Sequence, residues 1–188
     1  MLFRSGPFAQ RARDAKPDAV FVFVPAGQTA AAFMKAFAER ELSKAGIRLI
    51  TTGDVVGDST IDAVGEAALG VISSHHYSAA HDSPENQAFI KAYHDMYGPN
   101  ARPDFISMQA YDTLATIFEI GKRLNGNLDA DKFMAELRGF KLNSPRGPIM
   151  IHPETRDVAQ NIYIRRVEKR GNRFYNIEFD KLVSSGTE

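Results

Sequence analysis

The chain has 188 residues, enough for one ordinary domain or two small lobes. Its 23 basic residues balance its 23 acidic residues, so we expect no nucleic-acid partner that binds through bulk charge. The absence of cysteine excludes disulfides, thiolate zinc sites and cysteine nucleophiles. No apolar run approaches the ~20 residues that span a bilayer, and these residues contain no secretory signal pattern.

The segment Lys16–Gly27 carries the clearest signal of local structure. Its unbroken apolar run, Val20–Val24, predicts a strand covered on both faces, as in the parallel sheet of an α/β layer. In such sheets, ligands bind just beyond the carboxyl ends of the strands. The residues Pro25–Gln28 that follow are therefore the first candidate site.

The next elements continue the alternation of strands and helices. Apolar residues at helical spacing predict a helix after the first loop, and a second strand at Ile47–Thr51 completes a βαβ unit. Thr52–Gly57 is the second loop that follows a strand, and a third strand is expected at Gly70–Ser74. Ser83 followed by Pro84 predicts the start of another helix.

The second half of the chain changes character after two further predicted helices. A long helix is expected from Phe105 to near Gly126, and Asp129 is the expected cap of the next one. Apolar residues then recur at every second position, which predicts antiparallel strands with a hairpin turn at Gly171–Asn172.

This order of elements, with four particular stretches, resembles the type I periplasmic binding proteins of ABC importers. The similarity is to their branched-chain amino-acid (leucine/isoleucine/valine) class and extends from Phe8 to about Phe179. The stretches that carry it are AKPDAVFVFVPAG, LITTGDVVGDSTIDAVGEAALGVISSHHYS, SPENQAFIKAYHDMYG followed by QAYDTLATI, and SPRGPIMIHPETRDVAQNIYIRRV.

The resemblance implies an α/β molecule of two Rossmann-like lobes that close on a ligand by a hinge. Residues 7–76 would form most of lobe two, residues 77–149 the returning part of lobe one, and residues 150–188 a return to lobe two. Members of the family are about twice as long, so we expect the chain to be the C-terminal half, truncated at the N-terminus. The resemblance also implies a periplasmic or extracytoplasmic location, with the signal peptide outside this chain, and a membrane permease as partner.

Asp54 is the candidate ligand residue with the clearest chemical role. By the resemblance, an acidic residue at this point receives the α-ammonium of an amino acid, which needs a counter-charge and hydrogen bonds once it leaves water. The structural alternative is a loop carboxylate that accepts hydrogen bonds from the amides of its own turn.

Five further residues are candidates for ligand contact. Ala26, Gly27 and Gln28 form the first loop, where glycine allows close approach and a helix terminus offers N–H donors; the alternative is a plain strand-to-helix turn. Tyr77 would either contact an apolar group of the ligand or pack at the hinge. Phe105 would bring an aromatic ring to the cleft, although core packing is the stronger reading.

No metal or other cofactor is expected. The spacing of His75, His76 and His81 matches neither a helical histidine pair nor a knuckle, and no carboxylate motif accompanies it. Arg146 suits carboxylates, but the family stretch around it is a structural turn, so it is not counted as a ligand residue. The basic residues near the hairpin, interspersed with Glu168, are expected on a solvated edge: Arg165, Arg166, Lys169, Arg170 and Arg173.

The leading hypothesis is a non-enzymatic solute-binding component of an ABC importer that binds a branched-chain or other amino acid between two lobes. The same role with an aromatic acid or an amide is an alternative, as is a sensory or regulatory ligand-binding domain on the same fold. A small α/β enzyme is the remaining alternative, but the nucleophile elbow, zinc-protease, Walker and dinucleotide motifs are all absent.

Overall fold

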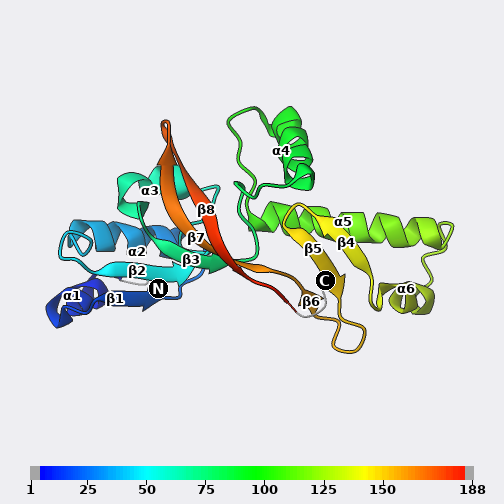
Figure 1. The fold of residues 1–188 in the computed structure, drawn as a ribbon, viewed down its shortest axis with the longest axis horizontal. Helices are drawn as coiled ribbons and strands as arrows, with labels where there is room; N and C mark the ends of the chain where they lie inside the picture. The colour runs from blue at the N-terminus through cyan, green and yellow to red at the C-terminus, as the bar shows by residue number, and fades with distance from the viewer. Residues whose placement is uncertain (1–4, 185–188) are drawn as a thin grey trace. The chain divides into compact units, whose positions relative to one another are not determined.

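The computed structural model describes residues 5–184, which divide into two units along the chain (Figure 1). Unit 1 contains residues 5–75 and Ile164–Asp180, and unit 2 contains His76–Tyr163 and residues 181–184. Within the described residues, no helix combines the length and the apolar composition needed to cross a bilayer. The two units are described separately below.

Unit 1 is built on a five-stranded sheet with the order β1-β2-β3-β7-β8. The strands β1, β2 and β3 are parallel, with Val22 opposite Thr51 and Ile50 opposite Ile72. This confirms the expected βαβ unit and parallel sheet. The elements that lie wholly or mainly in this unit are α1 (Gly6–Ala15), β1 (Ala19–Val22), α2 (Gln28–Glu39), β2 (Arg48–Thr52), α3 (Ile61–Val64), the 3-10 helix η1 (Gly65–Ala68), β3 (Ile72–His75), β7 (Ile162–Arg170) and β8 (Arg173–Leu182).

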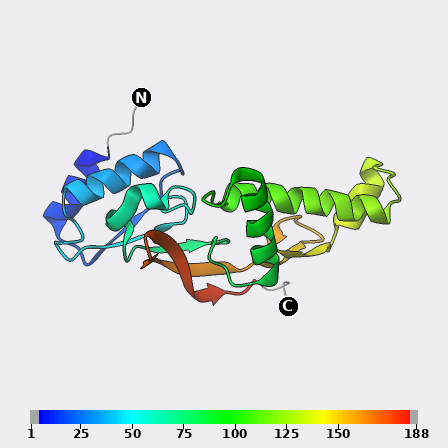
Figure 2. The same cartoon turned by 90° about the horizontal axis from the view of Figure 1, so that it is seen from above.

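The core of unit 1 lies on one face of this sheet. Phe33, Met34 and Phe37 of α2 are buried there, in the same cluster as Leu49 of β2 and Ala9 of α1. Figure 2 shows α2 running along one side of the strands. These three apolar side chains of the helix therefore face the sheet, as the helical spacing predicted.

The expectation that the first strand is covered on both faces is wrong for the described residues. Phe21 is 67% exposed, Phe23 is 70% exposed and Ile50 of the neighbouring strand is 39% exposed. Side chains alternate along a strand, so Val20, Val22 and Val24 face the helices while the two phenylalanines point to the opposite face. No helix among the described residues covers that face.

Unit 2 contains three helices and a separate small sheet. The helices are α4 (Pro84–Tyr97), α5 (Phe105–Arg123) and α6 (Ala130–Leu137). The strands β4 (Lys141–Ser144), β5 (Gly147–Ile151) and β6 (Val158–Ala159) form an antiparallel sheet in that order. Figures 1 and 2 both show α5 lying alongside this sheet.

The expected helix boundaries in unit 2 are confirmed by their caps. The Ser83 hydroxyl accepts a hydrogen bond from the Asn86 amide at 3.1 Å and α4 ends at Gly98, whose φ is +94°. Asp129 caps α6 by accepting from the Lys132 amide at 3.1 Å. These side chains satisfy amides that have no partner inside the helix.

The boundary between the units differs from the one expected at residue 150. The strands β5 and β6 pair with β4 inside unit 2, and the chain re-enters unit 1 only at Ile164. A two-residue connection, Pro145–Arg146, joins β4 to β5 and keeps them in register from Ser144 opposite Gly147. Because of this tight hairpin, the first part of the segment that was expected to return to the other lobe, from residue 150 onward, stays in the sheet of unit 2.

Helix α5 carries an apolar stripe that the described residues leave open. Leu114 is 55% exposed and Phe118 is 64% exposed, whereas Met108 and Ile120 are completely buried. All four residues belong to this one helix. Only part of that set is packed within unit 2, so the described helix presents apolar surface to solvent.

Candidate functional site

The two loops expected to carry the site leave the sheet of unit 1 at the same edge. Because β1 and β2 are parallel neighbours, their carboxyl ends lie side by side, and the parallel strand β3 ends beside them at His75. The tips of the two loops therefore lie at one rim of the sheet. Ligand sites of open α/β sheets form at such an edge.

The groups that the first loop offers to a ligand are backbone amides rather than side chains. Ala26, Gly27 and Gln28 are all exposed, and Gly27 adopts φ +91° as the residue that precedes α2. No side chain caps this helix start, so the amides of its first turn are not occupied by a cap. The positive φ explains why glycine occupies this position.

The second loop passes through a confined space. The Gly53 amide donates to the Ser74 carbonyl at 3.0 Å, which ties the loop to β3. A Cβ atom at Gly53 would collide with the His75 ring and would lie 2.5 Å from Nη2 of Arg165. Only a residue without a side chain fits between these two groups.

A buried polar network of side chains from β7 and β8 contacts this loop. Arg165 of β7 is 1% exposed, donates from Nη2 to Ser73 Oγ at 3.1 Å and lies with Nη1 3.7 Å from Asp58 Oδ2. Asn176 of β8 donates from Nδ2 to Asp58 Oδ1 at 3.0 Å and to the Val56 carbonyl at 2.8 Å. Strands that lie far along the chain therefore fix the loop that begins at Gly53.

The electrostatics of this network centre on Arg165. Burial lowers the pKa of its guanidinium, and the negative charges of Asp58, Glu178 and Asp54 oppose that shift. The expectation that Arg165 lies on a solvated edge is wrong. Arg165 lies on the same buried face of β7 as Tyr163 and Val167, at every second position of the strand. This spacing of two residues was the sequence signal that could have indicated its burial.

Asp54 stands apart from the rest of the network. It is half-buried, lying between the buried residues Gly53 and Val55. Within residues 5–184, no hydrogen bond or ion pair engages its carboxylate, although its charge acts on Arg165. The described residues therefore do not give Asp54 the loop-capping role that was its structural alternative.

The two aromatic candidates lie in unit 2. Tyr77 is completely buried, donates to Asn86 Oδ1 at 3.0 Å and packs edge-on against Phe89. Phe105, half-buried at the start of α5, packs against the same cluster and stands edge-on to His76 at 6.0 Å. The structure gives Tyr77 and Phe105 packing roles within unit 2, the alternative considered for each.

The three histidines occupy separate surroundings. His75 lies beside Gly53, the His76 ring is 3.1 Å from the Gln109 side-chain amide, and the His81 ring packs at a tilt against Tyr163 with ring centroids 4.9 Å apart. Among the described residues, no three histidine or acidic side chains gather in a way that would hold a metal ion.

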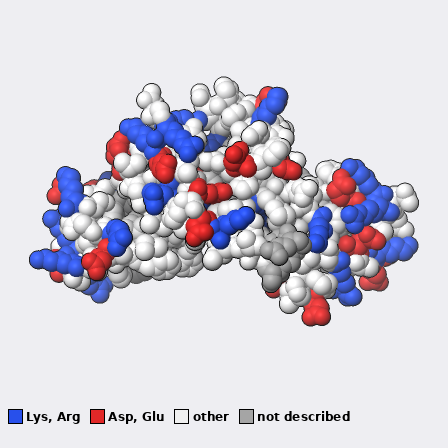
Figure 3. Space-filling view, in the orientation of Figure 1, with Lys and Arg blue, Asp and Glu red and all other residues white. Residues whose placement is uncertain are grey.

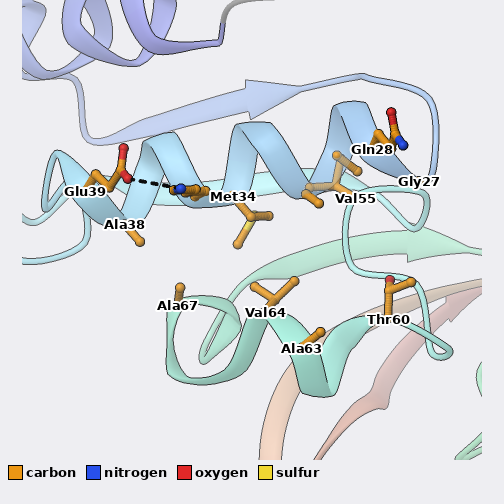
Figure 4. A pocket seen from close by; sticks show the side chains of 13 residues that line it. Gly27, Gln28, Met34, Ala38, Glu39, Val55, Thr60, Ala63, Val64 and Ala67 are labelled. Carbon is orange, nitrogen blue, oxygen red and sulfur yellow. Dashed lines mark ion pairs between the residues drawn. The ribbon is translucent and has the colours of Figure 1, made fainter.

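A groove of about 720 Å³ runs between α2 and α3 (Figure 4). Figure 4 shows Met34 pointing from α2 toward Val64, with Gln28 at one end and Glu39 at the other. The charged pair of this groove, Lys35 with Glu39 at 3.8 Å, is highly exposed. Its walls are mostly alanine and other apolar side chains, and its few polar side chains do not converge on one point, so we do not place the ligand here.

A second buried ion pair lies in unit 2. Arg146 Nε donates to Asp112 Oδ2 at 2.9 Å, and Ser144 Oγ donates to the same oxygen at 2.9 Å. Burial raises the pKa of Asp112 and lowers the pKa of Arg146. Asp112 Oδ1 has no hydrogen-bond partner among the described residues, and a groove of about 540 Å³ adjoins the pair.

The charged surface residues are mixed in sign. The basic residues at the β7–β8 hairpin pair with acids of α3 and η1, through Arg173 with Asp62 at 3.0 Å and Lys169 with Glu66 at 2.5 Å. Figure 3 shows basic side chains next to acidic ones on the visible face.

The family described as "Periplasmic binding protein" matches residues 5–172 of the chain. Among curated proteins, Leu/Ile/Val-binding protein homolog 6 of Brucella melitensis is 39% identical over 181 residues, which cover 96% of this chain and 46% of that protein.

Solved structures give the same result for the fold. A solute binding protein of an ABC transporter from Rhodopseudomonas palustris BisB5, in complex with 3,4-dihydroxybenzoic acid, is 52% identical with a TM-score of 0.90. The match covers 95% of this chain and 48% of that one. A solute binding protein from R. palustris HaA2, in complex with p-hydroxybenzoic acid, is 36% identical with a TM-score of 0.88, covering 97% and 50%.

The chain thus spans about half the length of the relatives that it matches. Their similarity extends over nearly all of its residues and includes the loops of unit 1. The α/β fold expected from the resemblance is confirmed by both comparisons. The chain therefore belongs to the periplasmic binding protein family.

Proposed function

We propose that the chain is part of the extracytoplasmic solute-binding component of an ABC importer, and that its ligand is a hydroxylated aromatic carboxylic acid. The observation that carries this proposal is the 52% identical structure with 3,4-dihydroxybenzoic acid bound. A second relative at 36% identity holds p-hydroxybenzoic acid. The membrane permease of the importer would be the protein partner.

The edge of the sheet in unit 1 supports a binding role. It offers amides at Gly27, a carboxylate at Asp54 that the described residues leave unengaged, and a loop fixed by a buried network. Few, firmly placed polar groups are typical of small-molecule sites. Neither loop holds a nucleophile next to a base, which supports binding rather than catalysis.

A branched-chain amino acid is the second candidate ligand, because the curated Brucella relative at 39% identity is named a Leu/Ile/Val-binding protein homolog. The two candidates differ in charge. An amino acid carries an ammonium group that Asp54 would neutralise, whereas a hydroxybenzoate carries only a carboxylate and neutral hydroxyls.

Calorimetry with a ligand panel tests the proposal. We would fuse the 188-residue chain to the part of the BisB5 protein that it does not cover, and titrate the fused protein with 4-hydroxybenzoate, 3,4-dihydroxybenzoate, leucine and valine. Because the chain covers 48% of the BisB5 protein, we expect weaker binding from the chain alone. Heat with the aromatic acids but not with leucine supports the proposal, and the reverse pattern rejects it.

A further inference from the structure

We propose that the surface along α5 in unit 2 is a docking groove for a polypeptide segment, and that Asp112 fixes the position of this segment by accepting a hydrogen bond from one of its N–H groups. The segment belongs to the part of the relatives that this chain does not cover, which is about half of their length. This inference does not depend on the proposed function, because it concerns a polypeptide partner of unit 2 and not the ligand.

Two adjoining grooves form this surface. The first, of about 540 Å³, lies beside Asp112, the second, of about 430 Å³, reaches Leu128, and Ile117 lines both. At 1.5 Å per residue, the lining from Gln109 to Gly121 extends for about 18 Å along one face of α5. Roughly five or six residues of extended chain have this length, so the surface suits a polypeptide better than a single-ring acid.

The side chains that line this surface are mostly apolar. Ile117 is 38% exposed, Phe118 is 64% exposed and Leu128 is 60% exposed. The apolar lining residues from α6, β5 and β6 are Phe133, Leu137, Ile149, Ile151 and Val158. Contiguous apolar surface of this kind marks a protein interaction site.

Asp112 adds a buried acceptor to this apolar groove. The residue is 4% exposed, and its Oδ2 atom accepts from Arg146 Nε and from Ser144 Oγ, both at 2.9 Å. Its Oδ1 atom has no hydrogen-bond partner among residues 5–184. Because leaving a buried acceptor without a donor costs free energy, a segment that brings a donor to Oδ1 is stabilised in the groove.

The hydrogen bonds around Asp112 identify the incoming group as a donor. The Thr113 hydroxyl donates to the Gln109 carbonyl at 2.8 Å, and Arg146 Nη1 donates to Gln160 Oε1. These donors are engaged within unit 2, whereas Asp112 Oδ1 can still accept. Every residue of a polypeptide except proline carries a backbone N–H, and apolar side chains beside it would pack on the groove walls.

Cysteine labelling tests whether the groove is covered, because the chain itself contains no cysteine. Thr113→Cys places a thiol at an exposed residue of the groove, and Met96→Cys places one on α4 at a residue that is 74% exposed and lines neither groove. Both variants are labelled with a maleimide in the 188-residue chain and in the fused protein described above. The fused protein without an introduced cysteine gives the background. We expect Thr113→Cys to react about 100-fold more slowly in the fused protein, and Met96→Cys to change by less than about twofold.

Asp112→Asn tests the hydrogen bond in the same assay. The single carbonyl oxygen of asparagine cannot serve Arg146, Ser144 and the docked segment together. Labelling of Thr113→Cys in the fused protein should therefore become about 10- to 100-fold faster. Ser144→Ala is the matched control, because it removes a hydrogen bond from Oδ2 of the same carboxylate and leaves Oδ1 unchanged; we expect a change of less than about threefold. Circular dichroism of the 188-residue chain establishes that each variant is folded.

Three outcomes would overturn the proposal. Equal labelling of Thr113→Cys in the chain and in the fused protein would show that the groove stays open. Slow labelling in the 188-residue chain that becomes faster on dilution would show that a second copy of the chain covers it. Equal effects of Asp112→Asn and Ser144→Ala would remove the role of Oδ1.

The labelling test also works without a folded fusion and without a ligand. If the fused protein does not fold, its two parts are mixed as separate polypeptides, and the same labelling rates decide. Because no ligand enters these measurements, their result is independent of the outcome of the calorimetry.

Discussion

Replacing Arg165 by methionine is the sharpest test of the buried network in unit 1. The substitution removes the guanidinium that faces Asp58 at 3.7 Å and donates to Ser73 at 3.1 Å, while the side chain keeps a similar length and apolar stem. Asp58 would remain buried, with Asn176 as its donor from β8. An ionised carboxylate would thus lose its counter-charge inside the unit.

The expected cost follows from the burial of both partners. The Arg165 and Asp58 side chains are 1% and 4% exposed, so solvent screens their interaction little. Breaking a buried pair by removing one partner costs about 3–5 kcal/mol, because the other charge is left uncompensated. The double variant Arg165→Met with Asp58→Asn removes both charges and should recover most of that loss.

Hydrogen exchange read by mass spectrometry suits this test because the chain has two units and a single unfolding transition is not assured. We would measure the free energy of opening for peptides that cover β2 and the loop up to Thr60. Arg166→Met is the control, since this exposed neighbour on the same strand should change stability by less than about 0.5 kcal/mol. A loss below 1 kcal/mol in Arg165→Met, or an equal loss in the double variant, would refute the reasoning.

Three further predictions concern packing, pH and exposed surface. Gly53→Ala should destabilise unit 1 by about 1–3 kcal/mol in urea unfolding, because its Cβ would meet buried groups, whereas Gly57→Ala, whose Cβ makes an ordinary 3.5 Å contact, should be nearly neutral. Burial raises the pKa of Asp112, so this residue contributes stability that is present at low pH and is lost as pH rises through its folded pKa. The free energy of unfolding of the wild-type protein, relative to that of Asp112→Asn, should therefore increase between pH 7 and pH 4. A stability difference between the two proteins that does not change with pH would contradict this. Replacing Phe21 and Phe23 by serine should lower the fluorescence of a dye that binds apolar surface with little change in urea stability, since both rings are mostly exposed; undiminished fluorescence would disprove it.

The order of elements was readable from local patterns of a few residues. Ser83 and Asp129 cap the helices they were expected to cap, and Gly171–Asn172 joins β7 to β8 as a two-residue turn. These signals are local because a cap or a turn is formed by neighbours in the chain. The rim shared by the two loops of unit 1 followed in turn from the parallel pairing of β1 and β2.

The sequence pattern did less well where burial depends on distant partners. It placed Arg165 on a solvated edge and expected cover on both faces of the first strand, and both expectations are wrong for the described residues. It also expected the chain to leave the second unit at residue 150, although β5 and β6 remain in the sheet of unit 2. A single strand pattern cannot tell which of its faces another element will cover.

The amino-acid sequence by itself determined the α/β alternation, the helix ends and the position of Asp54 in a loop that follows a strand. Only the tertiary structure decided that Arg165 is buried, that Gly53 is confined and that Tyr77 packs in a core. Arg165 meets Ser73 across 92 residues of chain, and Asn176 meets Asp58 across 118. Contacts at such separations leave no local periodicity, because they form only when the sheet brings those strands together.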